Sequence, residues 1–241
     1  IVQNFSGPNT QLVKSGNLRF DLLRPELRSS LKADSDALRQ KYGKFILIVS
    51  SFAFSNHFSG AEAYMEAQKK SLIIKTPEDE AFFRQYIVLQ DKNFKSFLDA
   101  VPDLARSFPD HRFVIRPHPG ENISVWESCK FVSPNIVIDN SGNIHSWIMA
   151  SDCIVHHFCT TALEAYAADI PAVAFRPYKD SSVESELPYV GSLQVDTKQD
   201  LIAKVRDIVS GNTKEINEMR AAVRPMLRTY IQNLDGPFCV E

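Results

Sequence analysis

A short apolar strand that runs into a proline-bracketed histidine constrains this chain more than any other feature. Residues 112–121 read Arg-Phe-Val-Ile-Arg-Pro-His-Pro-Gly-Glu. The apolar run is typical of a strand that is buried on both faces of a parallel sheet. The prolines on either side of His118 fix the backbone, and Gly120 permits a sharp turn. Ligands of open α/β sheets bind at the carboxyl ends of strands, so we expect Arg116 and His118 to meet a phosphate there.

A second strand end supplies hydroxyl groups. Residues 152–156 predict a strand, and residues 161–168 predict a helix that begins just after it. Thr161 and Glu164 have the spacing of a capping box at the start of that helix. A helix that begins at the carboxyl end of a strand directs free N–H groups into the crevice, which suits an anion. Thr160 and Thr161 are therefore candidates for phosphate binding.

Strands and helices alternate along most of the chain, which predicts an α/β protein with a Rossmann-like, doubly wound parallel sheet. Neither a GxGxxG fingerprint nor a P-loop sequence occurs, which disfavours a dinucleotide oxidoreductase and a P-loop ATPase. We expect an irregular helical insertion over 60–76, a kink before Pro102 and an interruption at Pro225. The expected strands are 45–49, 112–116, 135–139, 152–156, 171–175 and an edge strand at 192–195. The expected helices are 26–42, 77–108, 124–129, 144–150, 161–168, 198–210 and 213–233.

Composition excludes several classes of function. The 241 residues carry a formal net charge of −2 and no polybasic run, which argues against a nucleic-acid partner. No apolar segment is long enough to span a membrane. The scattered Cys129, Cys153, Cys159 and Cys239 form no disulfide framework and favour a reducing compartment. Cysteines and histidines cluster at 153–159, but residues 153–156 predict a buried strand whose side chains alternate between faces, so we do not expect them to converge on one metal ion.

Two further groups of candidate residues flank the strand at 45–49, one directly after it and one near the beginning of the chain. Ser50, Ser51 and His57 come after the clearest strand, which places them at the predicted crevice. Arg19 and Asp21 lie in a stretch that is either a plain loop or an interdomain hinge near the ligand. We expect residues 1–43 to form a hinge and connecting helix, and 44–241 to form the nucleotide-binding domain. The chain begins at Ile1 without a methionine, so we expect that its natural N-terminus is lacking.

Each candidate also has an ordinary structural interpretation. His57 could be a surface-loop residue, and Arg116 could pair with Asp139 or Glu121. His156 is expected in the core and His157 in the site. Three sets of residues have a second interpretation of this kind: Asp139 as a helix cap or turn residue, Glu164 as the acidic member of the capping box, and Phe52, Phe54 and Phe58 as packing rather than a nucleobase platform.

The order of these motifs resembles the C-terminal, nucleotide-binding half of a GT-B glycosyltransferase. Arg-Pro-His-Pro, then His-His-x-x-Thr-Thr-x-x-Glu-Ala, then Ile-Pro-Ala-Val-Ala-Phe follow one another at the spacing of that half. More closely, the chain is similar to a family of bacterial surface carbohydrate (surface polysaccharide) biosynthesis proteins. Gly16 to Asp21 and Tyr42 to Leu47 match its Gly-Asn-x-Arg-Phe-Asp and Tyr-Gly-Lys-x-Ile-Leu stretches. The resemblance covers most of 14–178 and extends to CDP-glycerol glycerophosphotransferases, bacterial sialyltransferases and capsule Kdo transferases.

The resemblance implies a glycosyltransferase that uses a nucleotide-activated sugar, with CMP- and CDP-linked sugars among the candidates, and a glycan or glycolipid acceptor. It implies that His118, Thr160 and Thr161 bind the donor phosphate and that Glu164 holds the ribose. Cys159 departs from the commoner Ser-Thr pair at this position. No cofactor or metal is implied. In GT-B relatives the acceptor-activating base generally comes from the N-terminal domain, so the isolated chain is expected to be inactive.

The sequence defines the cellular location and the reaction type of this protein less closely than its fold. A cytoplasmic protein is expected, either free or peripheral at the inner face of the cytoplasmic membrane. Two other functions remain open: a nucleotide-sugar 2-epimerase, which shares the GT-B architecture, and a non-catalytic nucleotide-binding module. A product assay without acceptor would identify an epimerase.

Overall fold

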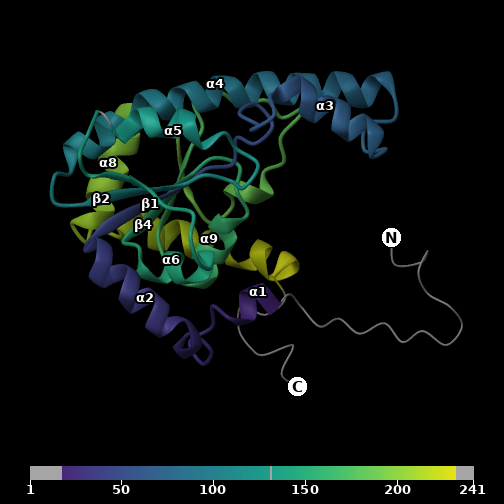
Figure 1. Cartoon of the computed structure of the whole chain (residues 1–241). Helices are drawn as coiled ribbons and strands as arrows, with labels where there is room; N and C mark the ends of the chain where they lie inside the picture. Colours follow the sequence, from purple (N-terminus) through teal and green to yellow (C-terminus); the bar gives the residue numbers. More distant parts are fainter. Residues whose placement is uncertain (1–17, 131, 232–241) are drawn as a thin grey trace, which may run out of the picture.

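The computed structural model describes residues 18–130 and 132–231, and a sheet of six parallel strands forms its centre (Figure 1). The strands lie in the order β3-β2-β1-β4-β5-β6, and each neighbouring pair is parallel. Their bounds are β1 Phe45–Val49, β2 Arg112–Arg116, β3 Ile136–Ile138, β4 Cys153–His156, β5 Ala172–Phe175 and β6 Leu193–Val195. The predicted doubly wound, Rossmann-like α/β fold is confirmed.

Helices cover both faces of the sheet. Apolar residues of α4, α5 and α8 pack on one face, and those of α2, α6 and α7 pack on the other. The bounds of the helices are α1 Leu18–Asp21, α2 Ser29–Tyr42, α3 Ala61–Lys70, α4 Pro77–Ser107, α5 Ile123–Lys130, α6 Ile144–Ala150, α7 Thr161–Ala167, α8 Lys198–Val209 and α9 Lys214–Tyr230, with a 3-10 helix η2 at Leu187–Tyr189. Residues 1–17 of the predicted hinge lie outside the described residues, as do Cys239 and the last two residues of the helix expected at 213–233.

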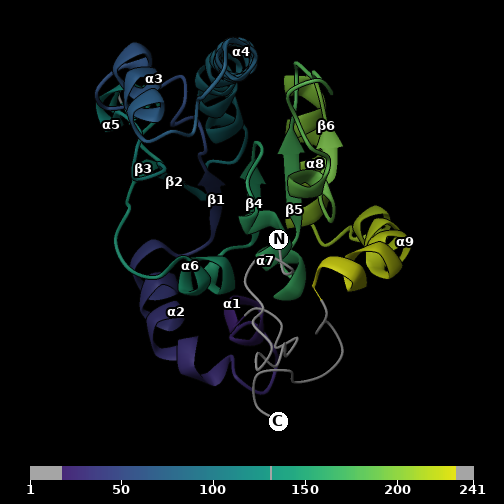
Figure 2. The same ribbon diagram turned by 90° about the vertical axis from the view of Figure 1, so that its right-hand side faces the viewer.

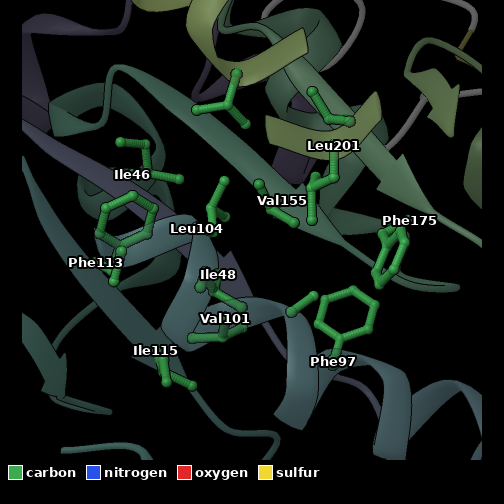
Figure 3. Close-up of a cluster of buried hydrophobic side chains, with 14 of the residues drawn as sticks. Ile46, Ile48, Phe97, Val101, Leu104, Phe113, Ile115, Val155, Phe175 and Leu201 are labelled. Atoms are coloured by element: carbon green, nitrogen blue, oxygen red, sulfur yellow. The ribbon is translucent and has the colours of Figure 1, made fainter. Parts of the chain in front are cut away.

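An apolar core lies on each face of the sheet, and strands β1, β2, β4 and β5 contribute side chains to both cores because successive side chains point to opposite faces. In β1, Ile46 and Ile48 belong to the cluster beneath α4, whereas Phe45 and Leu47 belong to the cluster beneath α2. Figure 3 shows Ile46 and Ile48 among side chains from β2, β4, β5, α4 and α8. A strand that is covered on both faces needs apolar residues at every position, which explains the unbroken run Phe-Ile-Leu-Ile-Val.

The strand order reverses between β1 and β4. From β1 the chain proceeds outward through β2 to β3, and it then returns to the other side of β1 as β4. Figure 2 shows the strands arranged from β3 to β6 across the molecule. Loops on either side of such a reversal diverge, so the ligand crevice of a fold like this is expected at the carboxyl ends of β1 and β4.

Helix α9 is continuous through Pro225, contrary to the expected interruption, and α4 is likewise continuous through Pro102, where the expected kink stays a prediction. Pro102 lies inside α4 and Pro225 lies inside α9. Around Pro102, Val101 and Leu104 are almost completely buried against the sheet. This packing offsets the hydrogen bond that the proline removes.

The insertion expected over 60–76 is a helix followed by a tight turn. Helix α3 lies against the first turns of α4, and together they extend past the sheet in Figure 1. Two ion pairs join the helices, Lys69 to Glu80 at 3.1 Å and Arg84 to Glu62 at 3.0 Å.

Candidate functional site

The carboxyl ends of β1, β2 and β4 bring most of the predicted site residues to one edge of the sheet. Ser50 follows β1, the loop with His118 follows β2, and Thr160 follows β4. Strands β2 and β4 pair with opposite sides of β1 in parallel register. The Pro-His-Pro loop and the threonine pair therefore stand at the same end of the sheet, on either side of β1.

Glu121 ties the loop after β2 to the loop after β1. Its carboxylate is almost completely buried and accepts hydrogen bonds from the Ser50 hydroxyl at 2.7 Å and from the Phe52 N–H at 2.9 Å. It also accepts from the His118 N–H at 3.2 Å and from Trp126 Nε1–H at 2.8 Å. Sequence reasoning considered Glu121 only as a partner of Arg116, because no local pattern marks a buried carboxylate with four donors. Ser50 consequently serves this network.

His118 is exposed at the edge of the crevice, and its ring is oriented by its own loop. Nδ1 accepts a hydrogen bond from the Gly120 N–H at 3.1 Å. In the neutral ring the proton then resides on Nε2, which leaves Nε2–H as the donor for a ligand. A side chain at position 120 would come within 3.3 Å of Ala53, 3.4 Å of His118 and 3.6 Å of His57. Gly120 therefore permits the close approach of the two histidine loops.

His57 lies beside the same glycine, as a part of the loop after β1. Its Nδ1 is 2.7 Å from the Ser59 hydroxyl, and its ring packs against Phe58 and Tyr64. Burial, and then the nearby positive charge of His118, lower the pKa of His57. The structure thus brings His57 and His118 together, although sequence reasoning left a plain surface loop open for His57.

Arg116 is occupied by main-chain carbonyls rather than by the carboxylates of Asp139 or Glu121. Its guanidinium donates to the carbonyl oxygens of Ser141 at 2.6 Å, Gly142 at 3.3 Å and Asp139 at 3.4 Å. It also lies 5.0 Å from the ring of Trp147. The side chain is buried, and this burial lowers its pKa. Arg116 therefore holds the loop after β3 through the main-chain carbonyls of that loop, and its guanidinium places a positive charge beside the crevice.

The carboxylate of Asp139 is held by other groups. It accepts hydrogen bonds from the Tyr42 hydroxyl at 2.5 Å, from the Ser141 N–H at 2.8 Å and from Lys41 Nζ at 3.2 Å. Although burial alone would raise its pKa, these hydrogen bonds lower the pKa below its usual range. Asp139 thus serves as a turn residue, one of the roles that sequence reasoning left open.

His156, the last residue of β4, and His157, which follows it, are both buried, which corrects the expectation that the side chain of His157 faces the crevice. His156 Nε2 is 2.9 Å from the Ser192 hydroxyl. The ring of His157 stacks on Phe52 at 5.3 Å, and its Nδ1 is 3.3 Å from the Phe175 carbonyl. Burial lowers the pKa of each histidine to about 3. The backbone at His157 is also held, because its carbonyl accepts a hydrogen bond from the Ser51 hydroxyl.

The capping box predicted at the start of α7 is wrong. Thr160 is the exposed N-cap residue, and its side chain makes no capping hydrogen bond. The Thr161 hydroxyl accepts a hydrogen bond from the Cys159 thiol at 3.2 Å. Glu164 turns instead to α1, where its Oε1 lies 2.7 Å from Arg19 Nη2. Its Oε2 lies 3.7 Å from Nε2 of His145, a residue of α6 that sequence reasoning did not single out.

Of the two predicted hinge residues, Arg19 pairs with Glu164 and Asp21 does not. Arg19 is 60% exposed on its side chain, whereas that of Glu164 is 4% exposed. Asp21 is buried at the other end of α1, and its two carboxylate oxygens have no hydrogen-bond partner in the described part of the chain. Helix α1 contacts α7, so residues far apart in the sequence meet at the carboxyl edge.

No group of three or more histidine, cysteine or acidic residues within 18–130 and 132–231 has the arrangement of a metal site. An Asp-x-Asp sequence does occur, at Asp34 and Asp36. It lies on the solvent side of α2, where Asp36 pairs with Lys32 at 2.6 Å. No helix in this part of the chain is long and apolar enough to cross a membrane.

A large cavity lies away from the histidine loops. It has a volume of about 690 Å³ and is bounded by the segment before α2, the end of α7, and α9. Four arginines and two acidic residues are among its lining, namely Arg24, Arg28, Arg220, Arg224, Glu26 and Asp169. Arg28 and Arg220 both pair with Asp169, at 3.0 and 2.7 Å.

Comparison with solved structures identifies the same architecture. The chain is similar to UDP-GlcNAc 2-epimerase from Methanocaldococcus jannaschii, in complex with UDP-GlcNAc and UDP, with a TM-score of 0.51 and 14% identity over 95% of this chain and 57% of that one. It is similar to MnaA from S. aureus with UDP, with a TM-score of 0.50 and 15% identity. This match covers 96% of this chain and 56% of that one. It is also similar to the wall teichoic acid polymerase TagF soaked with CDPG, with a TM-score of 0.51 and 11% identity. This match covers 92% of this chain and 47% of that one.

These likenesses show a Rossmann-like domain of the type found in GT-B glycosyltransferases and epimerases. The chain spans about half the length of the structures that it matches. No family model and no curated protein matches the sequence.

Proposed function

We propose that this chain is the donor-binding half of a nucleotide-sugar-dependent glycosyltransferase. The observation that carries the proposal is the placement of His118, an exposed imidazole on the loop after β2, which hydrogen bonds to Glu121 and from Gly120 orient next to the reversal point of the sheet. In doubly wound folds this is the position where ligands bind. The GT-B-like fold supports a nucleotide sugar as the ligand.

Glycosyl transfer from such a donor needs stabilisation of the nucleotide phosphate as it departs. Preorganised donors provide this best, because they do not have to reorient as negative charge develops. In our proposal His118 donates through Nε2 to the phosphate, and the exposed Thr160 hydroxyl contacts it from across β1. Arg116 contributes its charge from within the wall of the crevice. These groups would act without a metal ion.

We further propose that the acceptor-activating base belongs to a second domain. The chain alone would then bind a nucleotide weakly, because a cleft that two domains close excludes water better than one domain can. It would transfer nothing. The resemblance to surface polysaccharide proteins suggests a glycan or glycolipid acceptor, and a place in the cytoplasm or at the inner face of its membrane.

Nucleotide binding to wild type and His118→Ala tests the proposal. Thermal-shift and calorimetric titrations with CMP, CDP, UDP and GDP should show stabilisation by at least one of them. His118→Ala should lose about 1.5–3 kcal/mol of binding free energy, the worth of a charge-assisted hydrogen bond. His111→Ala, a histidine at the opposite end of β2, is the matched control and should bind as wild type does. Equal binding by wild type and His118→Ala would refute the assignment of the site.

An epimerase is the second candidate function. The fold favours it, because a UDP-GlcNAc 2-epimerase is among the solved structures that share this architecture. Incubation with free nucleotide sugars and no acceptor separates the two. Formation of an epimer would establish the epimerase, and nucleotide binding without any turnover, even with a supplied second domain, would indicate a binding module.

A further inference from the structure

Two buried polar groups face each other in the first turns of α6 and α7 without forming a hydrogen bond. His145 and Glu164 are 4% and 3% exposed, and His145 Nε2 lies 3.7 Å from Glu164 Oε2. Neither of these atoms, nor His145 Nδ1, has a hydrogen-bond partner within 18–130 and 132–231. Buried polar atoms are almost always paired, since an unpaired one forfeits its hydration without compensation. The pair therefore has the character of a site that a ligand completes.

The positions of both side chains are fixed by the surrounding structure. The Asn143 side chain accepts a hydrogen bond from the His145 N–H at 3.0 Å and so caps α6. Arg19 holds the other oxygen of Glu164, Oε1, at 2.7 Å. Helix α1 contacts α7 and lies beside it in Figure 2, so Arg19 reaches Glu164 from α1. A ligand therefore enters by displacing Arg19, whose side chain is mostly exposed.

A hydroxyl group fits this pair better than other ligand groups do. The gap between the two atoms is too long for a hydrogen bond, yet one oxygen atom can lie at hydrogen-bond distance from both. A hydroxyl donates its proton to the carboxylate and accepts a hydrogen bond from the imidazole N–H. A phosphate has no proton to offer and would be repelled by the carboxylate.

We propose that His145 and Glu164 together bind a ribose hydroxyl of the nucleotide, which makes His145 a specificity-determining residue. This inference rests on the proposed function and adds to it a residue and a discrimination. In doubly wound folds an acidic side chain near the reversal point binds ribose hydroxyls, and here the histidine reads the same hydroxyl from the opposite side. The site then selects ribonucleotides over deoxynucleotides.

The test compares the affinity of a ribonucleotide with those of its 2′-deoxy and 3′-deoxy counterparts. The ribonucleotide is the one that binds most tightly in the titration panel. Wild type should prefer it by about tenfold over at least one deoxy form. His145→Leu should abolish the preference while retaining affinity for the deoxy form. His145→Gln, which keeps a donor near the position of Nε2, should restore part of it.

His111→Leu is the matched control and should retain the full preference. A role of His145 in packing alone would change the stability of the fold but leave the ratio of affinities untouched. An unchanged ratio in His145→Leu, or equal binding of the ribo and deoxy forms by wild type, overturns the inference and leaves the proposed function standing. Absence of binding by every nucleotide overturns both.

Discussion

Leu72 occupies a backbone conformation that normally belongs to glycine. Its φ is +58°, and its side chain is 68% exposed in the turn between α3 and α4. The turn closes α3 through hydrogen bonds from the Leu72 N–H to the Lys69 carbonyl and from the Ile73 N–H to the Gln68 carbonyl. Glycine is the usual residue in such a left-handed helix cap, because a Cβ atom makes the conformation unfavourable.

We therefore expect Leu72→Gly to raise the free energy of unfolding, by about 0.5–1 kcal/mol, in spite of the flexibility that glycine adds to the unfolded chain. Urea denaturation measures the change. Ala67→Gly is the control, since it places glycine at an exposed position inside α3 and should lower the free energy of unfolding by about 1 kcal/mol. A Leu72→Gly variant that is less stable than wild type would show that the leucine side chain makes contacts worth more than the strain.

Single residues also show the limit of sequence reasoning. The positions of His118 and Thr160 could be predicted, because strand ends are readable from apolar runs and flanking prolines. The burial of His157 could not, because Phe52, which stacks on its ring, and the Phe175 carbonyl, which lies near its Nδ1, belong to segments that are distant in the sequence. Glu164 likewise had the spacing of a capping box, but a long-range ion pair with Arg19 replaces that local hydrogen bond.

At the scale of elements, Glu121 determines how two loops meet. One carboxylate serves donors from the end of β1, from the Pro-His-Pro loop and from Trp126 on α5. A glutamine at position 121 has only one acceptor oxygen. Its NH₂ group would face hydrogen-bond donors that the second carboxylate oxygen of Glu121 accepts from. We expect Glu121→Gln to lower the free energy of unfolding by about 3 kcal/mol and to weaken nucleotide binding.

Denaturant titration and calorimetry on the same sample measure both effects of Glu121→Gln. The matched control is Glu127→Gln, an exposed position on α5 that should stay within about 0.5 kcal/mol of wild type. If Glu121→Gln matched this control in stability and in binding, the loop after β2 would owe its shape to other contacts.

Most elements could be predicted to within a residue or two. Strand β1 and helix α6 have the bounds expected from apolar pattern and flanking turns. Helix α4 runs through Pro102 because its buried face packs on the sheet, and the sequence pattern around a proline carries no measure of that packing.

For the whole molecule, buried neutral histidines make stability depend on pH. The pKa values of His156 and His157 are about 3 in the folded protein, because burial disfavours their charged forms. The unfolded chain takes up protons on both residues below about pH 6.5, while the folded protein does not. Stability is therefore complete above pH 6.5 and falls as the pH decreases toward 3.

Each of these histidines should remove about 1.4 kcal/mol of unfolding free energy per pH unit well below pH 6.5. Urea denaturation between pH 7.5 and 4.5 measures the slope, in a window above the pH at which most carboxylates titrate. The variant with His156→Gln and His157→Gln should show a markedly flatter slope. An identical slope in wild type and variant would mean that these histidines are not buried in neutral form.

The central claim concerns where the whole molecule binds a nucleotide. The crevice between β1 and β4 and the arginine-lined cavity beside α9 are separate places that could each attract phosphate. A crystal structure of the 241-residue chain with a bound nucleoside diphosphate decides between them. We expect a phosphate oxygen at about 2.7–3.2 Å from His118 Nε2, with the ribose toward Glu164. A nucleotide held by Arg24 and Arg224, with His118 left unoccupied, would contradict the account.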